Sequence, residues 1–350
     1  MRIAQIAPLT ESVPPRLYGG TERVVSFLTE QLVAMGHDVT LFASGDSRTG
    51  AELAAVWPTA LRFDPSVRDA IAPHMLMLEQ VCRRAGEFDV LHCHLDYWTF
   101  PLFSRQSTPF LTTLHGRLDL PELRSIYHCF GDVPLVSISD AQRAPLPDAN
   151  FVATVQHGLP EDLLTPREVA PGYLAFLGRI CPDKRPDRAI RIARRAGIKL
   201  KIAAKVDRVD EDYFRDTIRP MIDGRHVELI GEITDAEKSD FLSGAIALLV
   251  PIDWPEPFGL VMIEAMACGT PVIAFNRGSV PEIVEHGVTG LIVEDETQAI
   301  AAIRRAGDMS RAAVRLGFER RFTAQRMAED YLALYRRLVA PARPVLRVVR

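Results

Sequence analysis

Two glutamates separated by seven residues, Glu256 and Glu264, flank the start of a predicted helix. Prolines on both sides of Glu256 favour a fixed, non-helical loop. The next stretch, residues 259–268, consists of good helix formers and stops at Gly269. Glu264 therefore lies inside the helix, about 7 to 8 Å further along its axis than Gly259. Two arbitrary glutamates in this setting would be a loop charge and an exposed helix position.

The start of this helix offers an anion site. Its first backbone amides, at Phe258, Gly259 and Leu260, have no partner within the helix and carry the positive end of its dipole. Such an end suits a phosphate group. A ligand with phosphates at its middle could then meet one carboxylate at each end, and a nucleotide sugar has that layout.

Two cations follow the first predicted strand in the second half of the chain. Arg179 and Lys184 come shortly after the apolar segment 173–177, and the carboxyl end of a strand faces the cleft in an open α/β sheet. An arginine can bind two phosphate oxygens and a lysine adds a mobile charge, so the pair could neutralise a diphosphate without a metal. The alternative is a surface basic patch, which is the interpretation for the neighbouring Arg185 and Arg188.

Two further segments end in residues that could reach a ligand. Gly19 and Gly20 lie between the first predicted strand and helix, where glycines let the backbone approach a ligand closely. The alternative is a simple turn, with Thr21 as a helix cap and Arg23 as a solvated charge. His115 ends an apolar strand and precedes a glycine, so its ring should project from the edge of the sheet. For this ring, a polar cap on the core edge is the alternative.

With its Glu-Pro-Phe-Gly-Leu core, the segment from Glu256 to Glu264 resembles the E-x7-E signature of the retaining glycosyltransferases of family 4, which have the GT-B fold. In that family the first glutamate contacts hydroxyls of the donor sugar, the amides after it hold the pyrophosphate, and the second glutamate bonds the ribose. The resemblance implies that the catalytic residues are Glu256, His115, Arg179 and Lys184. It implies that the donor is bound by Gly19, Gly20, Arg179, Lys184, Glu256, Phe258, Gly259, Leu260 and Glu264. A similar segment after the helix would add Gly278 and Ser279 to the surroundings of the donor.

The resemblance implies retaining transfer of a hexose from a nucleoside diphosphate sugar to a hydroxyl acceptor, with no cofactor and no metal. UDP-glucose is preferred to GDP-mannose as the donor, because the segment Tyr18–Arg23 resembles that of glucosyltransferase-like members. The acceptor would be a glycan, a glycolipid precursor or a small metabolite. One alternative is a nucleotide-sugar 2-epimerase of the same fold, which would need further acid/base carboxylates. The other is a non-catalytic module that binds a nucleotide or carbohydrate.

Two short motifs could suggest a metal site. His92 and His94 share a strand face, but neither a carboxylate nor a third ligand follows at a recognised spacing. Asp210 and Asp212 match the D-x-D pattern of another class of glycosyltransferases, yet they lie at a predicted helix start, where acids favour the dipole. Both motifs are interpreted as structural.

Composition places the chain among ordinary soluble proteins. It has 350 residues, 47% hydrophobic and 25% charged, and a net charge of −4, which gives no basic field for nucleic acid. Five scattered cysteines indicate neither a disulfide framework nor a zinc ribbon, and a reducing cytoplasm fits. No apolar run forms a signal peptide or approaches the ~18 to 20 residues of a membrane span. The arginines of the tail, from Tyr331 to Arg350, are interpreted as solvated; peripheral contact with anionic lipid is the alternative.

Strands and helices alternate twice along the chain, which predicts an α/β fold of two Rossmann-like domains facing across a cleft. The predicted strands are 2–7, 37–43, 89–94, 110–114, 135–139 and 151–155 in the first half, and 173–177, 200–204, 226–230, 247–250, 272–275 and 291–293 in the second. Ser139 is expected to cap a helix, with contact to the acceptor as the alternative, and Thr234 is expected to begin a capping box. The predicted domains are 1–163 and 172–322, and in the last segment, 323–350, the helix 324–338 would cross back to the first domain as in the GT-B fold.

Overall fold

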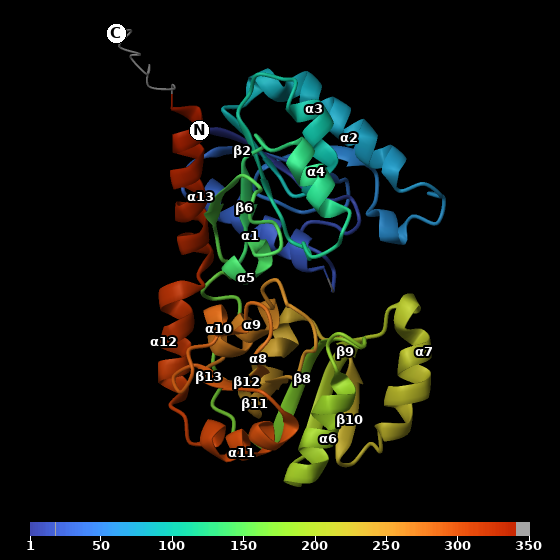
Figure 1. Ribbon diagram of the computed structural model, residues 1–350, viewed down its shortest axis with the longest axis vertical. Coiled ribbons are helices and arrows are strands. Elements are labelled where there is room, and N and C mark those ends of the chain that lie inside the picture. Colours follow the sequence, from blue (N-terminus) through green and yellow to red (C-terminus); the bar gives the residue numbers. More distant parts are fainter. Residues whose placement is uncertain (18, 341–350) are drawn as a thin grey trace.

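The computed structural model describes residues 1–17 and 19–340 of the chain. Its first half forms a parallel sheet of seven strands in the order β3-β2-β1-β4-β5-β6-β7 (Figure 1). The strands are β1 (Arg2–Ile6), β2 (Asp38–Ser44), β3 (Glu52–Trp57), β4 (Val90–Cys93), β5 (Phe110–Thr113), β6 (Leu135–Ser137) and β7 (Phe151–Thr154). The helices are α1 (Gly20–Ala34), α2 (Ile71–Arg84), α3 (Phe100–Phe103), α4 (Leu123–Cys129) and α5 (Asp140–Arg143). Strands β1 and β4 are buried on both faces, as is usual at the centre of a parallel sheet.

The second half repeats this plan with six parallel strands in the order β10-β9-β8-β11-β12-β13. The strands are β8 (Tyr173–Arg179), β9 (Leu200–Lys205), β10 (Val227–Gly231), β11 (Ala245–Val250), β12 (Val272–Phe275) and β13 (Gly290–Val293). The helices are α6 (Pro186–Ala196), α7 (Glu211–Tyr213), α8 (Asp235–Ser243), α9 (Leu260–Ala267), α10 (Val280–Ile283) and α11 (Glu296–Gly307). The strand order reverses between β1 and β4 in one sheet and between β8 and β11 in the other, and ligands bind at such switch points.

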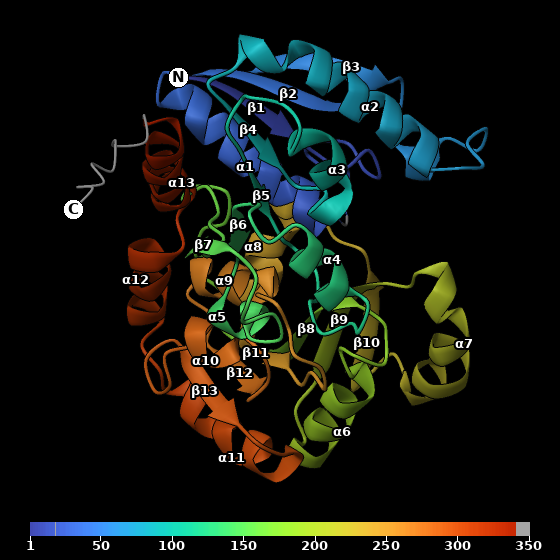
Figure 2. The ribbon, with the colours of Figure 1, turned by 45° about the horizontal axis from the view of Figure 1, so that its top comes forward.

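The last two helices connect the domains. Helix α12 (Arg311–Arg321) lies beside the second domain and α13 (Ala324–Val339) lies against the first, as both views show (Figures 1 and 2). Thr323 caps α13 by accepting a hydrogen bond from the amide of Arg326 at 3.2 Å. From the buried face of α13, Tyr331 bonds to Thr113 of β5. The predicted crossing of the last helix onto the first domain is confirmed.

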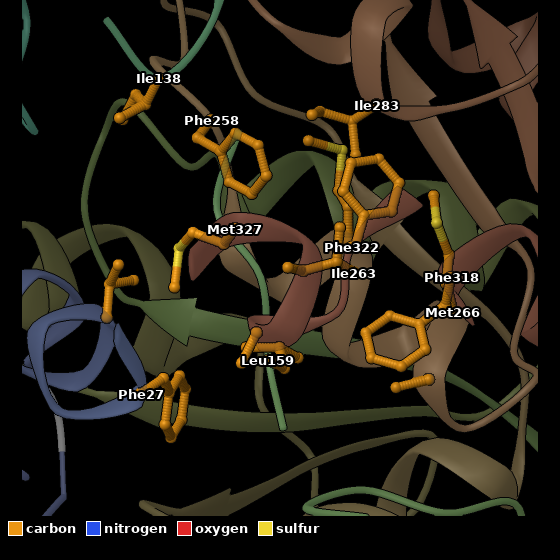
Figure 3. Close-up of a cluster of buried hydrophobic side chains, with 14 of the residues drawn as sticks. Phe27, Ile138, Leu159, Phe258, Ile263, Met266, Ile283, Phe318, Phe322 and Met327 are labelled. Carbon is orange, nitrogen blue, oxygen red and sulfur yellow. The ribbon is translucent and has the colours of Figure 1, made fainter. Parts of the chain in front are cut away.

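One cluster of buried apolar side chains contains residues of both domains (Figure 3). Phe258 of the second domain and Phe322, which precedes α13, pack edge to face with ring centres 6.2 Å apart. Leu159, which follows β7, and Ile138, which follows β6, belong to the same cluster. Because Phe258 comes two residues after Glu256, the loop that carries Glu256 is anchored in this shared core.

The α/β fold with two Rossmann-like domains is confirmed, and most predicted strands agree with the structure to within two residues. The predicted capping box at Thr234 is present at the start of α8. Four elements of the first domain, β3, α2, α3 and α4, were not predicted. Strand β3 is a partly exposed edge strand and α2 is amphipathic, so neither contains a long apolar run.

Candidate functional site

The carboxyl ends of the two sheets enclose a cavity of about 530 Å³, lined by residues of both domains. Its volume is typical of a small-ligand site. The residues predicted to be catalytic or to bind the donor all line this cavity, namely Gly19, Gly20, His115, Arg179, Lys184, Glu256, Phe258, Gly259, Leu260 and Glu264. The structure therefore brings together residues from two segments of the second domain, 179–184 and 256–264, and two loops of the first.

Glu256 and Lys184 form an ion pair at the cavity wall. The indole Nε1 of Trp254 donates a second hydrogen bond to Glu256, 2.9 Å from Oε2. The Lys184 ammonium lies 5.2 Å from the centre of the same indole ring, a distance at which a cation and an aromatic face attract. The sugar-binding and phosphate-binding candidates are thus in direct contact, and Trp254 orients both. Trp254 was not among the site residues predicted from the sequence.

The backbone of Glu256 is fixed by the segment that follows β12. The amide of Ser279 donates to the carbonyl of Glu256 at 2.9 Å, and its hydroxyl donates to the carbonyl of Phe258 at 2.9 Å. Gly278 has a φ of 53°, and a Cβ there would lie 2.4 Å from the amide nitrogen of Glu256. Gly278 and Ser279 do not themselves line the cavity. They act by supporting the Glu256 loop from behind.

Replacing Gly278 by alanine is expected to displace this loop. The clash with the Glu256 backbone cannot be relieved by a side-chain rotation, so we expect a loss of about 2 to 3 kcal/mol in the free energy of unfolding. Urea denaturation measures that loss, and nucleotide titration should show weaker binding. Gly287 is the matched control because its φ is 86° but a Cβ there meets nothing within 4 Å. If Gly287→Ala costs as much as Gly278→Ala, the contact with Glu256 is not the cause.

The start of α9 has the geometry predicted for an anion site. Gly259 precedes the helix with a φ of 82°, and a Cβ there would lie 2.7 Å from Cε of Met262. Among the described residues, no backbone carbonyl accepts a hydrogen bond from the amides of Phe258, Gly259 or Leu260. The amides of three successive residues at the cavity wall therefore remain available to a ligand.

Glu264 lies within α9, about one turn after Leu260, and is only 4% exposed. Lys238 of α8 pairs with it at 2.6 Å, and also contacts Asp235 at 3.2 Å. Asp235 in turn pairs with Arg23 of α1, in the first domain. Burial acts to raise the pKa of Asp235, but the charges of Lys238 and Arg23 hold it below its ordinary value. A row of alternating charges thus links Glu264 to the first domain.

The structure contradicts two alternative interpretations of the sequence, which concerned Arg23 and Thr21. Arg23 is 8% exposed and paired, so it is not a solvated charge. Helix α1 begins at Gly20 with Gly19 in the cap position, so Thr21 is not the helix cap. Thr21 and Arg23 instead line the cavity together with the two glycines.

Arg179 is held by two carboxylates of the loop after β9. Its guanidinium lies 3.2 Å from Asp210 and 3.6 Å from Asp207. Asp207 also contacts Lys205 at 3.0 Å and Arg62 of the first domain at 3.4 Å. Asp210, the first acid of the D-x-D pattern, therefore orients a cation of the site.

His115 contributes an uncharged ring to the cavity. Its Nε2 lies 2.9 Å from Nδ1 of His94, and burial lowers the pKa of His115 to about 3. The ring stacks on His157 with centres 5.3 Å apart. His157 also lines the cavity and was not predicted, because it lies after β7, outside any strand or helix. His115 can therefore exchange hydrogen bonds with a ligand but cannot supply a positive charge near pH 7.

The other motifs have internal partners. His92 bonds to Tyr335 and Thr113, both at 2.7 Å, and residues 1–17 and 19–340 contain no group of three or more His, Cys, Asp or Glu side chains that could hold a metal ion. Ser139 caps α5 as predicted, accepting from the amide of Gln142 at 2.9 Å. Its hydroxyl donates to the carbonyl of Pro257 across the domain interface.

Within the described residues, no helix is both long enough and apolar enough to cross a membrane. Of the tail arginines, Arg336 and Arg337 belong to α13. The remaining ones, Arg343, Arg347 and Arg350, lie outside the described residues, as does Tyr18.

Comparison with known proteins bears on both domains. The family described as Glycosyltransferase Family 4 matches residues 18–155, and the family described as Glycosyl transferases group 1 matches residues 166–317. D-inositol 3-phosphate glycosyltransferase of Mycobacteroides abscessus is 33% identical over 237 residues, which cover 60% of this chain and 51% of that protein. Phosphatidyl-myo-inositol mannosyltransferase of Mycobacterium leprae is 25% identical, covering 84% of this chain and 83% of that protein.

A solved structure extends the similarity to the whole chain. It is that of AviGT4, a glycosyltransferase involved in avilamycin A biosynthesis, which is 26% identical. It superposes with a TM-score of 0.74 over 98% of this chain and 99% of AviGT4. The two domain matches, the arrangement of both sheets and this neighbour together show that the chain belongs to the GT-B glycosyltransferases of the family 4 type.

Proposed function

We propose that the protein is a retaining hexosyltransferase that moves a hexose from a nucleoside diphosphate sugar to a hydroxyl acceptor. The observation that carries the proposal is the layout around α9. The amides at its start and the cations Arg179 and Lys184 line one cavity, and this cavity is also lined by Glu256, which precedes α9, and Glu264, which lies within it. A diphosphate at the amides would place the sugar beside Glu256 and the ribose beside Glu264.

In the proposed reaction, the bond between the anomeric carbon and the diphosphate oxygen breaks, and its electron pair leaves with the diphosphate. The acceptor oxygen bonds to the anomeric carbon on the same face, and its proton passes to an oxygen of the leaving diphosphate. Arg179, Lys184 and the amides at the start of α9 would stabilise the negative charge that develops on that group. Glu256 and His115 would hold the sugar in position. Same-face transfer follows the family resemblance, which is also the basis of the retaining assignment.

For the donor we propose UDP-glucose first and GDP-mannose second. Glucose is supported by the resemblance of residues 18–23 to the matching segment of glucosyltransferase-like members. The relative from Mycobacterium leprae is named a mannosyltransferase, which supports mannose. The two relatives are named for inositol 3-phosphate and phosphatidyl-myo-inositol, so an inositol-containing acceptor belongs beside the glycans, glycolipid precursors and small metabolites already considered.

Turnover of nucleotide sugars tests the proposal. The full chain is incubated with a panel of UDP- and GDP-hexoses, and release of the nucleoside diphosphate by slow hydrolysis is followed. We expect one donor to be consumed fastest, and NMR of the product formed with an added acceptor to show the anomeric configuration of the donor. Inverted products would exclude the retaining mechanism. Binding of a nucleotide sugar without any turnover would favour the non-catalytic module.

Activity is expected to survive removal of divalent metal ions. The positive charge that the departing diphosphate needs is present in Arg179, Lys184 and the amides of α9. Initial rates are compared before and after treatment with excess EDTA. Loss of all activity in EDTA, with recovery on addition of Mg²⁺ or Mn²⁺, would contradict this expectation.

A further inference from the structure

A chain of buried hydrogen bonds runs from α13 through the first sheet to the cavity. In order, its members are Tyr331, Thr113, His92, Tyr335, Gln5, His94 and His115. The first six are 4% exposed or less, and His115 is the member that lines the cavity. We call this set the buried chain. It accounts for polar side chains in the core of the first domain that the reaction itself does not use.

Gln5 is the fifth of the seven members of the buried chain, between Tyr335 and His94, and is fully buried in β1. Its carbonyl oxygen Oε1 lies 2.9 Å from Nε2 of His94. Its amide Nε2 donates to the hydroxyl of Tyr335 at 3.2 Å. A glutamine side chain has an acceptor at one end and donors at the other, so its orientation sets the direction of the hydrogen bonds on both sides.

The donor and the acceptor of each hydrogen bond can be assigned in turn from Gln5 to the cavity. A carbonyl oxygen only accepts, so Nε2 of His94 carries the proton of that hydrogen bond. A neutral imidazole has one N–H, so Nδ1 of His94 is an acceptor, and Nε2 of His115, 2.9 Å away, must carry a proton. The other nitrogen of His115, Nδ1, then has a lone pair.

The imidazole rings of His94 and His115 must both be neutral for the hydrogen bonds to have this direction. Burial lowers the pKa of His94 well below its ordinary value, and the neighbouring histidines lower it further. Burial alone lowers the pKa of His115 to about 3. Near pH 7 each ring therefore has one N–H and one acceptor nitrogen.

We propose that Gln5 is a positioning residue that acts through His94 to hold His115 in the Nε2-protonated tautomer, so that Nδ1 accepts a hydrogen bond from a hydroxyl of the bound sugar. The inference rests on the proposed function and adds the chemical group that His115 recognises. The lone pair of Nδ1 would attract a hydroxyl proton and repel a phosphate or carbonyl oxygen. With the Gln5 amide reversed, every hydrogen bond from Tyr331 to His115 would reverse, and His115 would present an N–H to the cavity.

The tautomer can be measured without any substrate. The full chain is labelled with ¹⁵N-histidine, and long-range proton–nitrogen correlation spectra distinguish protonated from unprotonated ring nitrogens. The signals of His115 are identified by their loss in His115→Asn. We expect the Nε2-protonated form in the natural protein. The Nδ1-protonated form would overturn the proposal, whatever the enzyme transfers.

Three variants test the role of Gln5. Gln5→Leu removes the acceptor for His94, and we expect the His115 signals to move toward a mixture of tautomers. Gln5→Glu keeps an acceptor at this position and should preserve the natural tautomer. Tyr331→Phe is the matched control, since it removes a buried hydroxyl from the far end of the buried chain and should leave His115 unchanged. An unaltered tautomer in Gln5→Leu would overturn the role of Gln5.

Kinetics with monodeoxy donors test the hydroxyl contact. Gln5→Leu should lower kcat/KM about tenfold with the parent donor, as expected for one lost hydrogen bond. The loss should be about twofold or less with the donor that lacks the hydroxyl bound by His115. An equal loss with every donor would show a merely structural effect and overturn the contact. If the natural protein turns over no donor at all, the proposed function fails, while the spectra still decide the tautomer.

Discussion

Replacing Lys184 by alanine is expected to lower kcat/KM for the donor about 10- to 100-fold, which corresponds to one charge-assisted hydrogen bond of about 1.5 to 3 kcal/mol. In the proposed complex the ammonium binds the diphosphate, and in the ligand-free protein it pairs with Glu256. The variant therefore loses a phosphate contact and also leaves Glu256 with Trp254 as its remaining partner described above. We expect weaker binding of the free nucleoside diphosphate as well, because the lost contact does not involve the sugar.

Steady-state kinetics and calorimetric titration of UDP or GDP measure both effects. Lys199→Ala is the matched control, because Lys199 also forms an ion pair, with Glu228 at 2.6 Å, but does not line the cavity. Unfolding in urea separates loss of binding from loss of stability. Unchanged kcat/KM in Lys184→Ala would exclude Lys184 from the phosphate site.

Much of the fold could be predicted because its strands are short apolar runs separated by turn residues. Strands β8, β11 and β12 are examples, with nearly all positions buried or partly buried. The order of strands in each sheet could not be predicted, because it depends on contacts between segments far apart in the chain. The pairing of β1 with both β2 and β4 is such a case.

The candidate site was predictable where its residues are close in sequence. Glu256, the amides after it and Glu264 belong to one loop and helix, so their spacing along the chain determines their spacing in space. Partners from other segments gave no such signal. Lys238, for example, pairs with Glu264 from a different helix, and its position in sequence is that of an ordinary exposed helix charge.

Partners from distant segments are also what made the buried chain impossible to predict from the sequence. Gln5 lies in β1 and His94 directly follows the neighbouring strand β4, whereas Tyr335 comes from a helix 330 residues after Gln5. A polar residue within an apolar strand signals that some partner must exist, because a buried amide without hydrogen bonds is costly. The sequence does not identify that partner, so His92 and His94 could be interpreted as structural but their hydrogen-bond partners could not be named.

Glu264→Ala is expected to weaken binding of both the nucleotide sugar and the free nucleoside diphosphate by about tenfold or more. In the proposed complex its carboxylate accepts hydrogen bonds from the ribose hydroxyls, which both ligands share. Glu264→Gln keeps an acceptor oxygen and should lose less affinity. The loss of charge also affects Lys238, which would retain Asp235 as a partner at 3.2 Å. Calorimetric titration of both ligands into both variants measures the effect.

Glu256→Ala should behave differently, because Glu256 is placed at the sugar end of the donor. We expect kcat to fall strongly while the affinity for the free nucleoside diphosphate stays within about twofold, a change of ~0.4 kcal/mol, or increases. An increase has a direct structural cause, since Glu256 pairs with Lys184 in the ligand-free protein and competes with the diphosphate for its charge. The same titrations decide between the two roles. Equal losses of nucleotide affinity in Glu256→Ala and Glu264→Ala would refute the assignment of the two glutamates to opposite ends of one donor.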